Sequence, residues 1–223
     1  ASLAADAAQD GLAILGAFHP GPADGAPAGT GTLVLLGPDG ARFWARLQAA
    51  SEWRDGAPDP IDRWSARVIG ALAARHGAAA LLPFGVDPPW PFWRWAVASG
   101  RCWPSPVRLL VHERQGLWVS FRGALALPEA VPLPLPPEAA PCARCADRPC
   151  LSACPAAALG AAGYDLAACH RWLDRPEGRA CLEAGCRVRA ACPVSRRFDR
   201  PPAQSAWHMR HFHPPARRDG TPG

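Results

Sequence analysis

The chain has 223 residues, of which 49% are hydrophobic and 19% charged, a balance too apolar for a disordered chain. All 24 basic residues are Arg, and the lack of Lys excludes enzymes that need a P-loop, Schiff-base or pyridoxal-phosphate lysine. The formal charge of +5 is uneven, because residues 140–223 hold 13 Arg against 7 acidic residues. Taken alone, such an excess suggests nucleic acid or an acidic partner.

Nothing in the sequence predicts a membrane or secretory protein. No apolar run approaches the roughly 18 residues that a membrane span requires. Residues 1–17 carry no basic side chain and contain Asp6 and Asp10, which is not typical of a signal peptide. We therefore expect a cytoplasmic protein, in which clustered Cys serve as metal ligands or redox groups rather than as disulfides.

Alternating strand and helix signals over residues 1–126 predict a layered α/β domain. The apolar run 32–36 is typical of a buried strand. Asp59 and Pro60 are expected to begin a helix, with Asp59 as its N-cap and an apolar stripe that ends before Gly77. A second strand is predicted over 79–84.

The prediction continues with a short helix in the aromatic segment 90–100 and two strands at 107–111 and 117–121. Six of the fifteen residues 127–141 are Pro, which predicts a semi-rigid connector. Residues 142–200 are expected to form a small α+β ferredoxin-like domain. The remainder, 201–223, is rich in Pro, Arg and His and is expected to be an extended basic tail.

Eight of the nine Cys lie between residues 142 and 192. The spacing is Cys-x2-Cys-x4-Cys-x3-Cys-Pro from Cys142, then an isolated Cys169, then Cys-x4-Cys-x5-Cys-Pro from Cys181. In two-cluster ferredoxins the Cys of a Cys-Pro pair ligates the other iron–sulfur cluster, and this chain has two such pairs.

Eight thiolates match two 4Fe–4S clusters with none left over, and the crossing rule divides them. The first cluster is assigned Cys142, Cys145, Cys150 and Cys192. The second is assigned Cys154, Cys169, Cys181 and Cys186. Each Cys-Pro pair is expected to begin a helix that leads away from the clusters. Two alternatives stay open: two four-thiolate zinc sites, because paired Cys knuckles are also typical of zinc, or a disulfide framework.

The Cys motifs and the run Tyr164-Asp165-Leu166 before Cys169 resemble the dicluster ferredoxin segment of epoxyqueuosine reductase. The order of elements upstream resembles the corrinoid-binding domain of that family more loosely. The resemblance implies two 4Fe–4S clusters and an oxidoreductase-like superfamily, with cobalamin or flavin as a further expected cofactor of the N-terminal domain. We expect no counterpart of the C-terminal repeat domain of the family, and the Cys spacings here are longer.

Several other residues have both a functional and a structural interpretation. Cys102 beside Trp103 reads as a buried inert thiol rather than a reactive one. Asp87 is either a proton donor or a turn carboxylate. Five aromatic residues either wall a flat cofactor or pack in the core: Trp90, Phe92, Trp93, Trp95 and Trp103.

The His residues near the Cys segment have similar alternatives. His170 adjoins Cys169 and either tunes a cluster by hydrogen bonding or lies at the surface. His208, His211 and His213 either ligate a metal or belong to a solvated basic tail.

Three functions follow from the sequence. The first is an intracellular electron-transfer protein with two 4Fe–4S clusters and a redox partner protein. The second is a reductase in which the clusters feed a corrinoid or flavin in the N-terminal domain. The third, a zinc-stabilised nucleic-acid binder, ranks last because no base-stacking motif accompanies the Arg residues. Part of the Arg excess is explained as charge balance around anionic clusters.

Overall fold

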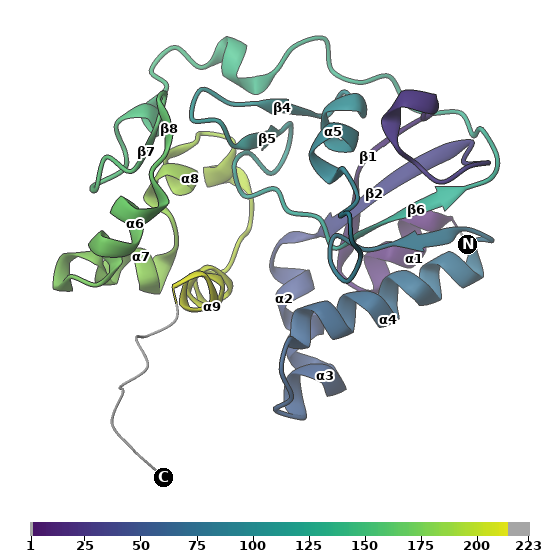
Figure 1. Cartoon of the computed structure of the whole chain (residues 1–223), viewed down its shortest axis with the longest axis horizontal. Coiled ribbons are helices and arrows are strands. Elements are labelled where there is room, and N and C mark those ends of the chain that lie inside the picture. Colours follow the sequence, from purple (N-terminus) through teal and green to yellow (C-terminus); the bar gives the residue numbers. More distant parts are fainter. Residues whose placement is uncertain (1, 214–223) are drawn as a thin grey trace.

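A four-stranded sheet organises the N-terminal lobe of the computed structural model, which describes residues 2–213 (Figure 1). The strand order is β1-β2-β6-β3, and every neighbouring pair is antiparallel. The strands of this sheet are β1 (Leu12–Phe18), β2 (Thr32–Pro38), β3 (Ala79–Leu81) and β6 (Gly123–Leu127). Helices and strands occur together, so the predicted mixed α/β fold class is confirmed.

Five helices and a hairpin complete this lobe. The helices are α1 (Leu3–Gln9), α2 (Gly40–Ala49), α3 (Ser51–Arg54), α4 (Pro60–Arg75) and α5 (Phe92–Ala98). The hairpin pairs β4 (Cys102–Pro104) with β5 (Leu110–His112). A short 3-10 turn, η1, spans Pro22–Asp24.

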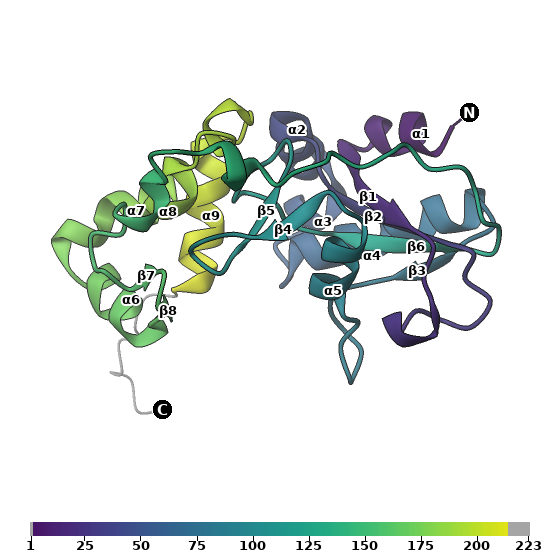
Figure 2. The ribbon, with the colours of Figure 1, turned by 90° about the horizontal axis from the view of Figure 1, so that it is seen from above.

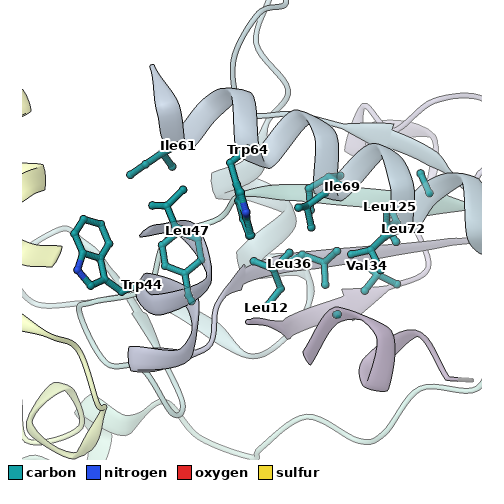
Figure 3. Close-up of a cluster of buried hydrophobic side chains, with 14 residues drawn as sticks. Leu12, Val34, Leu36, Trp44, Leu47, Ile61, Trp64, Ile69, Leu72 and Leu125 are labelled. Atoms are coloured by element: carbon teal, nitrogen blue, oxygen red, sulfur yellow. The ribbon is translucent and has the colours of Figure 1, made fainter. Parts of the chain in front are cut away.

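Strand β2 explains why this sheet has helices on both sides. Its apolar residues alternate between two buried clusters: Val34 and Leu36 belong to one, Leu33 and Leu35 to the other. The first cluster packs α2 and α4 against the sheet, and Figure 3 shows Trp64, Ile69 and Leu72 directed at Leu12, Leu36 and Val34. The second cluster places α5 on the opposite face. A continuous apolar strand therefore requires cover on both faces.

The smaller C-terminal lobe consists of short elements. They are β7 (Leu159–Gly160), β8 (Gly163–Tyr164), α6 (Leu166–Leu173), α7 (Arg179–Ala184) and α8 (Arg187–Ala191). Single 3-10 turns lie between them: η2 (Pro141–Arg144), η3 (Pro149–Leu151), η4 (Pro176–Gly178) and η5 (Ser195–Arg197). Its apolar core includes Val107, Val111 and Leu117 from the preceding domain, so the two lobes share a core.

Several predicted elements need correction. Residues 117–118 form a turn and 119–121 have no regular structure, so the predicted strand 117–121 is absent, and the strand predicted at 107–111 is the shorter β5 (Leu110–His112). The place in the sheet between β2 and β3 belongs to β6. Residues 82–84 lie outside β3, which is shorter than predicted. Asp59 does precede α4, but its backbone is left-handed, with φ of 52°, and its side chain makes no cap hydrogen bond.

The predicted extended tail is wrong for residues 202–212, which form helix α9 (Pro202–Phe212). Pro202 suits the first helical position because its missing N–H has no partner to lose there. Trp207 of α9 packs against Trp53 and Trp44, with ring centroids 5.7 and 6.4 Å apart. Figure 2 shows α9 between the two lobes. Residues 214–223 of the predicted tail lie outside the described residues.

Candidate metal centres

Each of the two predicted Cys sets surrounds its own cavity. Site 1 is a cavity of about 280 Å³ lined by the four Cys of the first set, Cys142, Cys145, Cys150 and Cys192. Site 2 is a cavity of about 310 Å³ lined by the second set, Cys154, Cys169, Cys181 and Cys186. Neither cavity is lined by a Cys of the other set. All nine Cys are free thiols, so no disulfide of the alternative framework is formed.

Two tight turns and a helix end place the thiols of site 1. Cys142 lies in η2 and Cys145 ends that turn, where its N–H bonds the Cys142 carbonyl at 3.3 Å. Cys150 lies in η3, and Cys192 ends α8. Short turns suit this arrangement because they bring thiols that are close in sequence around one cavity.

Three helices and a turn place the thiols of site 2. Cys169 lies on α6, whose first turn is capped by the Asp165 carboxylate accepting from the Ala168 N–H at 2.8 Å. Cys181 lies on α7, and Cys186 is the N-cap of α8. The Ala158 N–H donates to Cys154 Sγ at 3.3 Å, the kind of backbone contact that stabilises a thiolate ligand.

Gly185 makes the approach of Cys186 to site 2 possible. Its φ is +94°, a conformation that side chains disfavour, and an added Cβ would lie 2.7 Å from Ser205 Cβ. Any larger residue there would push α9 away from the ligand loop. The glycine therefore lets α9 close over site 2.

The Cys-Pro pairs do not begin α-helices as predicted. Cys154-Pro155 leads into a turn and then the β7–β8 hairpin. Cys192-Pro193 leads into the single 3-10 turn η5. In both places the proline still ends the preceding ligand loop, because its ring fixes φ and it donates no hydrogen bond.

The thiols of each set influence one another's pKa. Burial, and next the neighbouring thiols, raises the pKa of Cys142 and Cys150 in site 1 and of Cys169 and Cys181 in site 2. The thiols that raise each pKa belong to the same set in every case. Metal binding would have to displace these protons, since the thiolate is the ligand.

The size of the cavities bears on which metal group fits. A tetrahedral zinc site with Zn–S bonds of about 2.3 Å holds its sulfurs only about 3.8 Å apart. Among residues 2–213, no three His, Cys, Asp or Glu side chains converge closely enough to hold a single ion. Instead the thiols stand around cavities of about 280 and 310 Å³. Each cavity is large enough for a group of several atoms, such as the 4Fe–4S clusters that the Cys motifs predict.

Two short connections tie the sites together. Cys150 of site 1 and Cys154 of site 2 are four residues apart, so their Cα atoms lie at most about 14 Å apart. Cys186 of site 2 and Cys192 of site 1 stand at opposite ends of α8, which spans about 9 Å over those six steps. Val188 of α8 is buried between them in the shared core.

Cys102 and Asp87 lie away from the two cavities. Cys102 is fully buried, as predicted, and burial raises its thiol pKa to about 12, which favours the interpretation as an inert thiol. Asp87 is exposed in the loop between β3 and α5 and lines neither cavity.

Core packing accounts for most of the aromatic set. Trp95 is fully buried and contacts Trp90 and Phe92, with ring centroids 5.8 and 5.2 Å apart. Trp103 packs against the shared core, and Trp93 is 46% exposed at the surface. None of these side chains lines site 1 or site 2.

His170 and His213 lie together, His208 and His211 have other partners, and none of them belongs to a metal group among the described residues. His170 stacks on Phe212, and its Nδ1 lies 2.6 Å from His213 Nδ1. His213 also reaches Asp174 at 3.0 Å, and His211 stacks on Trp207. His208 lines the site 2 cavity, where burial lowers its pKa to about 3.

The site 2 cavity extends beyond the thiols into a part that the sequence did not indicate. Arg122, Arg189, Arg200 and His208 line this extension, which we call the Arg pocket. These residues come from the segment before β6, from α8, from the loop before α9 and from α9 itself. Single Arg residues so far apart in the sequence carry no motif, so no sequence signal would have found the pocket.

No helix within residues 2–213 combines the length and apolar character that crossing a membrane requires. Comparison with known proteins gives no match: no protein-family model, no curated protein and no solved structure matches this chain. The resemblance to epoxyqueuosine reductase therefore rests on the Cys motifs and stays a prediction.

Proposed function

We propose that the chain is an electron-transfer protein that holds one 4Fe–4S cluster at site 1 and one at site 2. The observation that carries the proposal is the division of eight free thiols into two groups of four, each around a cavity of about 300 Å³. The same division follows from the two Cys-Pro pairs, through the crossing rule of two-cluster ferredoxins. Each bound cluster would accept and release single electrons.

The residues between the sites have two roles in this proposal. Val107, Leu117 and Val188 are buried in the shared core and keep water out of the space between the sites. Helix α8 and the segment 150–154 each connect a Cys of one site to a Cys of the other, with the Cα atoms of each such pair at most about 14 Å apart. A short, dry and rigid connection favours transfer of an electron from one site to the other.

Exposed Arg residues rim site 1 and indicate the redox partner. Arg144, Arg148 and Arg197 line that cavity and are exposed to solvent. A cationic rim attracts an acidic surface and speeds encounter with it. We therefore propose an acidic redox protein as the partner that exchanges electrons at site 1.

A second candidate function is a reductase, favoured by the extension of the site 2 cavity to Trp118, Ser120 and Arg122 of the N-terminal lobe. A small molecule bound there would lie next to site 2. Cobalamin or flavin remains the proposed cofactor of this alternative. Assays for cobalt and flavin on the purified protein distinguish it from simple electron transfer.

The test is iron and acid-labile sulfide analysis of anaerobically purified protein, with about eight of each expected per chain. The double variant Cys142→Ala/Cys145→Ala should lose the iron of site 1, and Cys181→Ala/Cys186→Ala that of site 2. Electron paramagnetic resonance of each reduced variant should show the signal of the remaining site.

The matched control is Cys102→Ala, which removes the ninth Cys from a buried position outside both cavities. It should keep the full iron content. Two zinc ions per chain and a colourless protein would overturn the proposal and favour the zinc-stabilised nucleic-acid binder. Loss of all iron in Cys102→Ala would show that the eight-thiol assignment is wrong.

A further inference from the structure

The Arg pocket concentrates positive charge in a part-buried space. Arg122, Arg189 and Arg200 are each only partly exposed, and all three line the same cavity as His208. Their charges act on one another: after burial, Arg189 and Arg122 are the causes that lower the pKa of Arg200 to about 10. Like charges held together away from water are costly unless an anion compensates them.

Few of the available donors are used within the protein. Each guanidinium carries five N–H donors. Among the described residues, Arg189 donates to the Leu117 carbonyl at 2.6 Å and Arg200 donates to Ser205 Oγ at 2.9 Å. The Nε of Arg122 is buried without a hydrogen-bond partner. Arg122 forms a long ion pair with the Asp62 carboxylate at 3.9 Å, a distance too great for a hydrogen bond.

Charge balance around site 2 does not account for all three Arg residues. The charges that act on the site 2 thiols and on Tyr164 beside them come from Arg187 and Arg189. Arg122 and Arg200 line the part of the cavity next to His208, and among the described residues Arg122 has only the distant Asp62 as an acidic partner, whereas Arg200 has none. They point to a second anion in addition to the thiolates and cluster of site 2.

We propose that the Arg pocket binds the phosphate or carboxylate group of a small molecule, held by Arg122 and Arg200 next to site 2. Guanidinium groups suit this role because their donors match the oxygens of both anions in pairs. Trp118 forms one wall, and its ring packs against the Arg200 guanidinium 4.9 Å away, which holds that side chain in position. Anion binding by the Arg pocket does not depend on the clusters, whereas a role of the pocket as a substrate site rests on the proposed function.

The test is anaerobic calorimetry of the iron-loaded protein with inorganic phosphate and, separately, with acetate, each against chloride at equal ionic strength. We expect one of the two anions to bind in preference to chloride, and the stronger binder identifies the ligand class. Arg122→Gln and Arg200→Gln should each weaken that binding at least tenfold. Arg210→Gln removes the same charge from an exposed position on α9 and should change the affinity less than twofold.

Measurements on the unaltered protein test the proposal even if one of the Arg variants fails to fold. The preferred anion should raise the thermal midpoint of the unaltered protein more than chloride does, because it binds only the folded state. It should also perturb the resonance signal of site 2 and leave that of site 1 unchanged. Binding no stronger than chloride, or equal binding in all three Arg variants, would overturn the inference.

Iron analysis of the same samples separates the two proposals. Anion binding by protein without iron would overturn the proposed clusters and leave the anion site standing. Full iron content without anion binding would overturn the anion site and leave the proposed clusters standing.

Discussion

The interiors of the two lobes differ. The N-terminal lobe packs helices on both faces of a sheet, with large side chains such as Trp64 and Trp95 almost fully buried. The C-terminal lobe has short elements, and two of the seven buried residues in its core are Cys. The first lobe therefore has large apolar cores of its own, whereas the stability of the second would depend on the proposed clusters if its thiols bind them.

Iron removal should give the largest difference between the lobes. Chelation of the reduced protein should abolish amide protection over residues 142–192, lowering protection factors by more than about 100-fold. Strand β2 and helix α4 should keep theirs, because their contacts are apolar. Hydrogen exchange with mass spectrometry measures both at once. Equal loss in the two lobes would contradict an independent N-terminal core.

Substitution in the N-terminal core should destabilise the N-terminal lobe and leave the iron content unchanged. Trp95 is fully buried and its Nε1–H donates to the Asp24 carbonyl at 2.8 Å. Trp95→Ala should lower the free energy of unfolding of this lobe by about 3–5 kcal/mol, as measured in denaturant. Iron content should stay unchanged.

The neighbouring Trp93 provides the control, because it is 46% exposed on the same helix. Trp93→Ala should change the free energy of unfolding by less than about 0.5 kcal/mol. A cost similar to that of Trp95→Ala would mean that helix propensity, rather than burial, sets the effect.

A smaller effect should come from acid, through His112. Its Nε2–H donates to the Leu15 carbonyl at 3.0 Å, and its Nδ1 accepts from two backbone N–H groups. Burial lowers its pKa from 6.5 to about 4. Below pH 6.5 the unfolded chain takes up a proton that the folded chain refuses, so stability falls down to about pH 4.

The expected slope for this single proton is at most about 1.4 kcal/mol per pH unit. Hydrogen exchange of the β4–β5 hairpin between pH 7 and 4 measures it. His112→Gln should be less stable at pH 7 and should lose this part of the slope, whereas the exposed His19→Gln should keep it. An unchanged slope in His112→Gln would show that another group titrates.

The elements predicted correctly have strong local signals. Helix α4 begins at Pro60 and ends before Gly77, where the backbone turns with φ of +62°. Strand β2 has an uninterrupted apolar run. By contrast β6 (Gly123–Leu127) is short and rich in Gly and Ala, and its pairing with residues 32–36 and 79–81 places it in the sheet. Such long-range pairing leaves no local signature.

The candidate site also has a part that the sequence predicts and a part that depends on long-range contacts. The two Cys-Pro pairs predict which thiols lie together, because the crossing rule depends only on sequence order. The Arg pocket depends on how α9 lies between the lobes, and α9 is anchored by Trp207 against Trp44 and Trp53. The low apolar content of residues 202–212 predicted an extended tail, and nothing in that segment indicates its distant aromatic partners.

The crossing of the ligands has a consequence for the order in which the protein is made. Three of the proposed ligands of site 1 lie within residues 142–150, yet the fourth is Cys192, the last of all eight Cys. During synthesis site 2 therefore has its full ligand set once Cys186 has emerged, while site 1 is still incomplete. The site whose ligands appear first is the last to close, by which time every strand of the N-terminal sheet has been made.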